Sequence, residues 1–240
     1  MGLVLNKENQ LFESVKQNIE ETLEEISKAA QTAGRNPDDI RLMAVTKTKP
    51  LEYAEAAYKA GLRQFGENRV AEMAEKYTEF HEDAEIHLIG HLQRNKAKKA
   101  AQTADSVDSI DKYETAFELD KFCKTFNRTI DILLEFNTSS EDSKSGFLKE
   151  DELLSSVDKI RQLSSLRIKG LMTIAPFTDD EKSIRKAFRQ LKSLFDKISV
   201  SHPDLSLETL SMGMSSDFKI AIEEGSNVIR IGTKLFGSRY

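Results

Sequence analysis

Cysteine is almost absent from this 240-residue chain. The one thiol, Cys123, excludes a disulfide within the chain, and its place in a helical pattern predicts a buried side chain rather than a nucleophile. Long apolar runs are also absent, since no stretch approaches the roughly 18 residues that cross a membrane. The first residues carry Lys7, Glu8 and Glu13 where a signal peptide would be apolar. We therefore expect a soluble cytoplasmic protein with no role at a membrane.

An excess of basic charge is missing as well. The 35 Lys and Arg residues face 40 Asp and Glu residues, which gives a net charge of −5 and no general reason to expect nucleic acid as the partner. One basic cluster, Arg94–Lys99, opens a helical pattern without interleaved aromatic residues. We interpret it as a solvated face; a surface for phosphorylated ligands or a partner protein is the alternative.

What the sequence does contain is a regular alternation of strand and helix patterns. The strands are expected at 40–47, 65–68, 85–91, 106–110, 129–136, 166–173, 205–211 and 227–232. The helices are expected at 6–33, 51–60, 70–80, 96–102, 112–126, 149–163, 179–199 and 216–224. This order predicts an α/β protein: a single (β/α)₈ TIM barrel, close to its typical length of about 250 residues, with an extra N-terminal helix.

The connecting segments complete this prediction. No linker-like segment divides the chain, so residues 1–240 are expected to form a single domain. The polar segment 137–146 is expected to be a mobile loop, and residues 235–237 are expected to cover the seam where the barrel closes. An open doubly wound sheet is the competing fold, but the Gly-x-Gly-x-x-Gly turn that often follows its first strand is missing.

Lys47 is the first candidate functional residue, because it stands at the C-terminal end of the first expected strand. Ligands of α/β barrels collect at that end of the strands. A lysine that points into such an interior tends to lose its proton, and a neutral amine attacks carbonyl groups. The position therefore indicates Schiff-base chemistry, whereas a solvated lysine beside Lys49 is the alternative.

A phosphate site is indicated after the last two strands. Ser215 and Ser216 follow strand 205–211 and are expected to cap helix 216–224, while Gly232 and Thr233 follow strand 227–232. Glycine permits close backbone approach, hydroxyls donate hydrogen bonds, and a helix N-terminus attracts anions. TIM barrels frequently bind phosphate in these two loops. The Walker pattern is absent, so ATP is not implied.

Arg230 helps to identify the ligand that would reach from Lys47 to the expected phosphate site. An aldehyde at one end and a phosphate at the other describe pyridoxal 5′-phosphate, and they also describe a phosphosugar held by a Schiff-base aldolase. Arg230 lies two residues before Gly232, so both face the same side of the strand. A guanidinium keeps a pyridine nitrogen unprotonated, and a sugar has no such nitrogen. A phosphate clamp or a salt bridge inside the barrel is the alternative role.

Five motifs in this order resemble the pyridoxal-phosphate homeostasis protein family, which is related to the barrel domain of bacterial alanine racemase. The motifs are Val45–Pro50, Phe65–Asn68, His87–Lys96, Ser211–Ser215 and Arg230–Thr233. The resemblance implies that the chain binds pyridoxal 5′-phosphate as a Schiff base and contributes to vitamin B6 and amino-acid homeostasis as a carrier or buffer. The residues that it assigns to the cofactor are Lys47, Asn68, His91, Met212, Met214, Ser215, Ser216, Arg230, Gly232 and Thr233.

We expect no enzymatic turnover and assign no catalytic residue. An unprotonated ring nitrogen beside Arg230 is a poor electron sink. Alanine racemase uses a tyrosine from a second domain, and only about eight residues follow the last expected strand here, so no such domain is expected. A racemase-like enzyme that uses His91 or Lys49 as the proton carrier is the alternative. Apo forms of pyridoxal-phosphate enzymes are the expected recipients of the cofactor.

A metal site is not expected. His87 and His91 are four residues apart, but on a strand this spacing does not bring them together as it would on a helix, and no acidic third ligand is evident. We expect a monomer.

Overall fold

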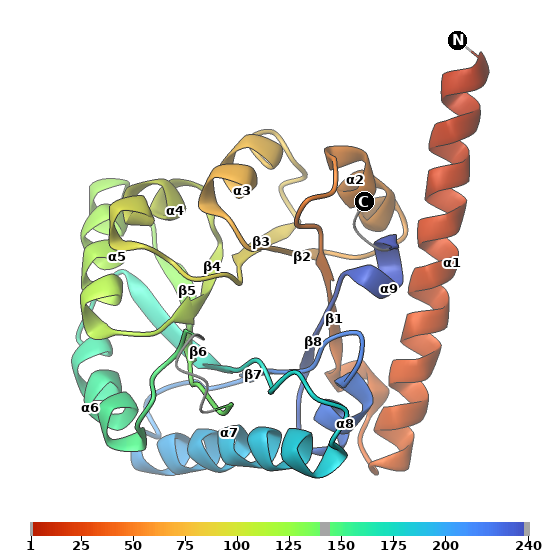
Figure 1. Ribbon diagram of the computed structural model, residues 1–240. Helices are drawn as coiled ribbons and strands as arrows, with labels where there is room; N and C mark the ends of the chain where they lie inside the picture. The colour runs from red at the N-terminus through yellow and green to blue at the C-terminus, as the bar shows by residue number, and fades with distance from the viewer. Residues whose placement is uncertain (1, 140–144, 238–240) are drawn as a thin grey trace.

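The computed structural model describes residues 2–139 and 145–237, without the side chains of residues 2–6. In this part of the chain eight parallel strands follow one another around a closed barrel, and helices form an outer ring (Figure 1). The strands are β1 (Arg41–Val45), β2 (Gln64–Glu67), β3 (Glu85–Leu88), β4 (Ser106–Ile110), β5 (Ile130–Glu135), β6 (Leu166–Met172), β7 (Thr209–Ser211) and β8 (Val228–Ile231). The predicted (β/α)₈ barrel is confirmed.

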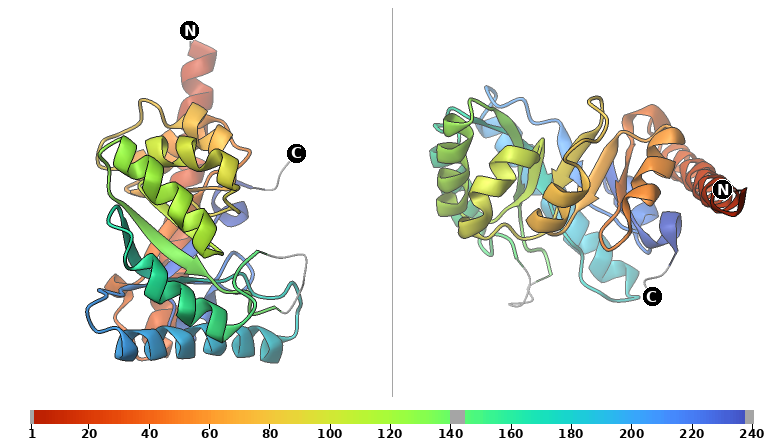
Figure 2. Two further views of the ribbon diagram at one scale, coloured as in Figure 1. Left: turned by 90° about the vertical axis from the view of Figure 1, so that its left-hand side faces the viewer. Right: turned by 90° about the horizontal axis from the view of Figure 1, so that it is seen from above.

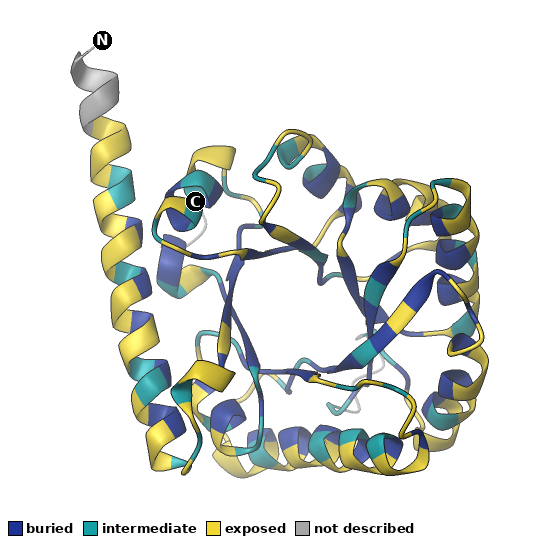
Figure 3. Ribbon diagram, turned by 180° about the vertical axis from the view of Figure 1, so that it is seen from behind, coloured by how far each residue is buried: buried dark blue, intermediate teal, exposed yellow. Residues whose placement is uncertain are grey.

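The helices lie on the outside of this barrel. They are α1 (Gly2–Thr32), α2 (Leu51–Lys59), α3 (Val70–Lys76), α4 (Ala97–Thr103), α5 (Tyr113–Thr125), α6 (Glu150–Ile160), α7 (Glu181–Ser201), α8 (Phe218–Glu223) and α9 (Thr233–Phe236), with short 3₁₀ turns η1 (Pro37–Asp39) and η2 (Arg94–Lys96). Their buried faces point toward the strands and their exposed faces point outward (Figure 3). No helix in the described ranges is long and apolar enough to cross a membrane.

The main hydrophobic core lies between the strands and the helices. Because side chains alternate along a strand, β1 sends Leu42 and Ala44 outward into this core and Met43 and Val45 inward. The predicted burial of Cys123 on α5 is confirmed. The covered outer face therefore accounts for the apolar strand patterns in the sequence.

The interior of the barrel holds two cavities, one above the other. The lower one, at the N-terminal ends of the strands, has a volume of about 490 Å³, and the upper one, at their C-terminal ends, has a volume of about 730 Å³. Four strands contribute side chains to both cavities, and the two contributing residues of each strand are two positions apart, because every second side chain of a strand points to the same face. In each of the following pairs, the first residue lines the lower cavity and the second lines the upper one: Met43 and Val45 on β1, His87 and Ile89 at β3, Leu133 and Glu135 on β5, and Val228 and Arg230 on β8.

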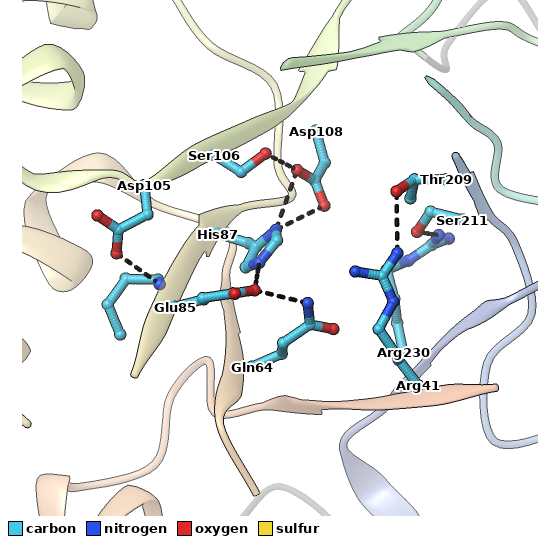
Figure 4. Close-up of polar contacts among 11 residues, drawn as sticks. Arg41, Gln64, Glu85, His87, Asp105, Ser106, Asp108, Thr209, Ser211 and Arg230 are labelled. Carbon is cyan, nitrogen blue, oxygen red and sulfur yellow. Dashed lines mark hydrogen bonds and ion pairs between the residues drawn. The ribbon is translucent and has the colours of Figure 1, made fainter. Parts of the chain in front are cut away.

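A polar network fills part of the lower half (Figure 4). His87 Nδ1 lies 3.1 Å from Oδ2 of Asp108, and Oδ1 of the same carboxylate accepts a hydrogen bond of 2.5 Å from Ser106 Oγ. His87 Nε2 lies 3.6 Å from Glu85, which accepts a hydrogen bond of 2.7 Å from Gln64. The interior below the upper cavity is thus held by charged pairs in addition to apolar contacts.

Helix α1 is the predicted extra N-terminal helix, and it stands against one side of the barrel (Figure 1; Figure 2). Val15, Ile19 and Ile26 recur at helical spacing and bury the face that packs against α2, α8 and α9. Its end is held by Arg35, whose Nη1 donates to the carbonyls of Ile222 and Ser226 at 2.7 and 2.6 Å. The helix therefore joins the beginning of the chain to its last elements.

Several predicted elements are shorter than expected, including helix 70–80, observed as Val70–Lys76, and strand 85–91, observed as Glu85–Leu88. Residues 205–207 do not join the sheet: the N–H of Leu205 bonds to His202 and that of Leu207 bonds to Leu205 in successive turns, so β7 is only Thr209–Ser211. The alternating leucines imitated a strand because they pack, half-buried, against the core. Helix 216–224 is reduced to α8, Phe218–Glu223. Residues 140–144 of the loop predicted at 137–146 lie outside the described residues.

Candidate functional site

Lys47 lies just beyond the C-terminal end of β1 and lines the upper cavity. The preceding residue, Thr46, points the other way, and its buried hydroxyl lies 2.7 Å from Glu67 Oε1 and 2.6 Å from the Tyr77 hydroxyl. The following residue, Thr48, has φ of +64°, a strained conformation for a β-branched residue, and its N–H donates to Glu72 at 2.6 Å. Both neighbours of Lys47 are therefore held in place.

A lysine behind β1 completes this support. Lys76 Nζ donates to Glu67 at 2.6 Å, to Glu72 at 3.0 Å and to the carbonyl of Thr46 at 2.9 Å. Burial raises the pKa of Glu67, while the hydrogen bond from Lys76 opposes that rise. The network fixes the end of β1 from the side opposite to the cavity.

Arg230 enters the upper cavity from β8 and is 4% exposed. Its Nη1 donates to Ser211 Oγ at 2.7 Å and its Nη2 donates to the carbonyl of Thr173 at 2.8 Å. Burial lowers the pKa of the guanidinium, and the charge of Asp108 and of other nearby carboxylates opposes this. Two strands therefore hold Arg230 in a fixed position next to the cavity.

The loops after β7 and β8 form the adjoining wall. Met214 to Asp217 is a tight turn, in which Asp217 Oδ1 accepts the Met214 N–H at 2.6 Å. The expectation that Ser215 or Ser216 caps the following helix is wrong, because Asp217 occupies the N-cap position. Both serines line the cavity instead. Gly232 approaches β1 so closely that a Cβ would lie 3.0 Å from the carbonyl oxygen of Val45.

The structure brings nine of the ten predicted cofactor residues to one cavity. They are Lys47, Asn68, His91, Met214, Ser215, Ser216, Arg230, Gly232 and Thr233. The tenth, Met212, is fully buried in the outer core and does not line the cavity. It directly follows β7, where its side chain points toward the helices.

Asn68 and His91 lie in neighbouring loops, after β2 and β3. Gly90 packs on the backbone of Asn68, and a Cβ at this glycine would lie 2.3 Å from the Asn68 carbonyl oxygen. His91 Nδ1 lies 3.1 Å from Asp111 Oδ2, and burial raises the pKa of Asp111. His87 lines the other cavity, so the two histidines do not meet. Within residues 2–139 and 145–237 no group of three side chains could hold a metal ion.

Glu135 is the residue that the sequence analysis missed. It ends β5, lines the upper cavity and is 4% exposed, and its Oε2 has no hydrogen-bond partner. Burial and the charge of Asp111 raise the pKa of Glu135 to about 7, while Arg230 opposes the rise. The sequence does place Glu135 at the C-terminal end of a strand, where ligands of a barrel collect, just as it places Lys47 after the end of β1. A single carboxyl group after an apolar run is, however, compatible with many roles.

Comparison with known proteins agrees with this architecture. Residues 16–240 match the family model of the alanine racemase N-terminal domain, so the chain belongs to this class of proteins. An alanine racemase of Clostridium difficile, 17% identical, superposes with a TM-score of 0.73 over 93% of this chain and 56% of the racemase, a likeness that shows the fold.

A narrower family is also shown. The pyridoxal phosphate homeostasis protein of Pasteurella multocida is 39% identical over 229 residues, which cover 94% of this chain and 98% of that protein. PipY of Synechococcus elongatus, in a structure with PLP bound, is 35% identical with a TM-score of 0.77 over 88% of this chain and 100% of that one. The chain belongs to the pyridoxal phosphate homeostasis protein family.

Proposed function

We propose that this chain binds pyridoxal 5′-phosphate in the upper cavity and serves as a carrier or buffer of the cofactor. The observation that carries the proposal is the presence of Lys47, Arg230 and the Ser215–Ser216 turn around one cavity of about 730 Å³. The donor set fits the group: an amine for an aldehyde, a fixed guanidinium for a pyridine nitrogen, and hydroxyls for a phosphate. The PLP-bound structure of PipY supports the same assignment.

The proposed roles follow from the position of each side chain. Lys47 would hold the cofactor covalently through its aldehyde, and Arg230 would be the partner of the ring nitrogen. Ser215, Ser216 and Thr233 would supply hydroxyl donors for the phosphate, and Gly232 would leave room for it. Asn68, His91 and Met214 form the remaining walls. Met212 supports the loop from the outer core and has no direct contact in this proposal.

We infer a non-catalytic role from what surrounds the cavity. When bound, pyridoxal phosphate supplies a ring that withdraws electrons, most strongly when its nitrogen is protonated. Arg230 cannot give up a proton, so it keeps that nitrogen unprotonated. None of the four described tyrosines lines the cavity, so among the described residues no phenol takes the place of the racemase tyrosine. We place this carrier in the cytoplasm, with apo forms of pyridoxal-phosphate enzymes as recipients.

Covalent attachment is the direct test. Protein incubated with the cofactor should absorb in the visible range, and borohydride reduction followed by peptide mapping should place a phosphopyridoxyl group on Lys47. Lys47→Ala should lose the adduct, whereas Lys49→Ala, the matched control from the same cavity, should keep it. An adduct on Lys49, or no chromophore, would contradict the assignment.

Exchange of the α-hydrogen of alanine in deuterated water separates the carrier from an enzyme. We expect negligible exchange, together with measurable transfer of the cofactor to an apo-enzyme. Arg230→Glu should protonate the ring nitrogen and raise any trace of exchange. Rapid exchange that disappears in Lys47→Ala would show α-proton chemistry and would refute the non-catalytic role.

A further inference from the structure

Glu135 is the only carboxyl group among the described residues that line the upper cavity. Arg230, the nearby cation, directs both of its described hydrogen bonds to Ser211 and Thr173, and neither goes to Glu135. β5 is four strands from β1 in the closed barrel, so Glu135 faces the Lys47 side across the cavity. A buried carboxylate oxygen without a hydrogen bond is costly, and a ligand that donates to it would remove that cost.

The electrostatic surroundings favour a cation at this point. The groups that face Glu135 are Asp111, from the loop after β4, and Arg230, from β8. Asp111 directs Oδ2 to His91 at 3.1 Å, but its Oδ1 is also buried without a partner. This side of the cavity therefore has two carboxyl groups with open acceptor positions, whereas its one guanidinium is already hydrogen-bonded. It carries net negative charge as the pH rises above neutrality.

The dimensions and chemistry narrow the class of cation. A metal ion needs several ligands, and the described residues offer no such group. A primary ammonium is small and carries three donors. A free amino acid would bring its carboxylate toward Glu135 and Asp111, where like charges repel. A volume of about 730 Å³ is in the range of sites for drug-sized ligands, so one ring and one phosphate leave room beside them.

We propose that Glu135 binds the ammonium group of a primary amine on an uncharged carbon chain, such as an alkylamine or a lysine side chain. The biological meaning rests on the proposed function, because a primary amine is the chemical class that competes with Lys47 for an aldehyde. Glu135 Oε2 also accepts the proton that an ammonium loses when it becomes a nucleophile. Glu135 thereby selects the amine that approaches the bound cofactor.

The test begins with cofactor-free protein and n-butylamine. In protein with ¹³C-labelled glutamate carboxyl groups, butylamine should lower the pH at which Glu135 titrates, and calorimetry should show tighter binding at pH 8 than at pH 6. Glu135→Gln should weaken binding by roughly 10- to 100-fold, the range expected for a hydrogen bond to a charged group. Asp179→Asn, an exposed carboxylate in the loop between β6 and α7, is the matched control and should change nothing.

The probes also separate the possible sources of the amine. Nα-acetyl-lysine amide should bind if lysine side chains fit, butan-1-ol should not bind, and alanine should bind at least tenfold more weakly than butylamine. Equal affinity for butylamine and butan-1-ol, equal binding by the parent and Glu135→Gln, or an unmoved Glu135 titration would overturn the proposal. If butylamine binds but the separate borohydride experiment finds no adduct on Lys47, only the cofactor assignment is refuted, since the amine test needs no cofactor.

Discussion

Asp108→Asn is the most informative change in the lower half of the barrel. The carboxylate of Asp108 lies 3.1 Å from His87 Nδ1, and asparagine keeps its size while removing the charge. Burial alone would lower the pKa of His87, but Asp108 and Glu85 outweigh burial and raise it to about 10. The variant would leave a buried imidazolium with one longer ion pair, at 3.6 Å to Glu85.

The expected loss can be worked from these values. A rise in pKa from 6.5 to about 10 corresponds to about 5 kcal/mol, which is the effect of the ion pairs after the cost of burial has been subtracted. Removal of one partner from a buried pair costs about 3–5 kcal/mol, so Asp108→Asn should lose most of this free energy of unfolding at pH 7. Because the folded pKa of His87 lies above the unfolded one, the stabilisation is full below pH 6.5 and disappears as the pH rises through 10.

Urea unfolding of both proteins at a series of pH values between 6 and 11 measures this difference. The gap between parent and variant should be widest near pH 6, narrow steadily as the pH rises from 6.5 to 10, and be nearly closed at pH 11, while titrations elsewhere cancel in the comparison. Ser106→Ala removes only a hydrogen bond to Asp108 and should cost about 1 kcal/mol at every pH. A gap that stays constant up to pH 11, or one below about 1 kcal/mol at pH 7, would refute the reasoning.

Further outcomes follow from the upper half and from the whole chain. Gly213→Ala should destabilise the protein by about 1–3 kcal/mol in urea unfolding and weaken cofactor binding, because a Cβ would lie 2.6 Å from that of Ala221 at a φ of +97°. Thr46→Val should cost about 1–3 kcal/mol, because Glu67 and Tyr77 each lose a buried partner; unchanged unfolding would contradict this. Calorimetry should give one cooperative transition, and two separate transitions would mean more than one domain. Sedimentation equilibrium should give the mass of a monomer, 27.1 kDa.

The barrel and much of the candidate site could be predicted because the fold links position to role. Strand patterns located the strand ends, and the ends of β1 and β8 located Lys47 and Arg230. The placement of Ser215 and Ser216 at the cavity was right although their assigned capping role was wrong. Position relative to a strand end is thus more reliable than the detail of a cap, since caps depend on one or two backbone angles.

Other features depend on contacts between distant segments. Glu135 ends an apolar run, and only the folded barrel shows that its Oε2 is enclosed and lacks a hydrogen-bond partner. Thr46, Glu67 and Lys76 meet because three elements converge, which no local pattern records. The leucines of 205–207 alternate like strand residues, yet their backbone turns instead of pairing. In each case tertiary packing decided between locally equivalent alternatives.

The attachment of α1 has a consequence for synthesis on the ribosome. Its carboxylate Glu25 pairs with Lys219 and Lys234, and its Asn18 donates to the carbonyl of Leu235, so these partners are made only after strands β1 to β7. β1 likewise waits for β8 to close the barrel. The part of the apolar face of α1 that packs against α8 and α9 must therefore stay exposed until those helices have emerged. Nascent chains stalled before α8 should bind chaperones through this helix, and completion of α9 should release them.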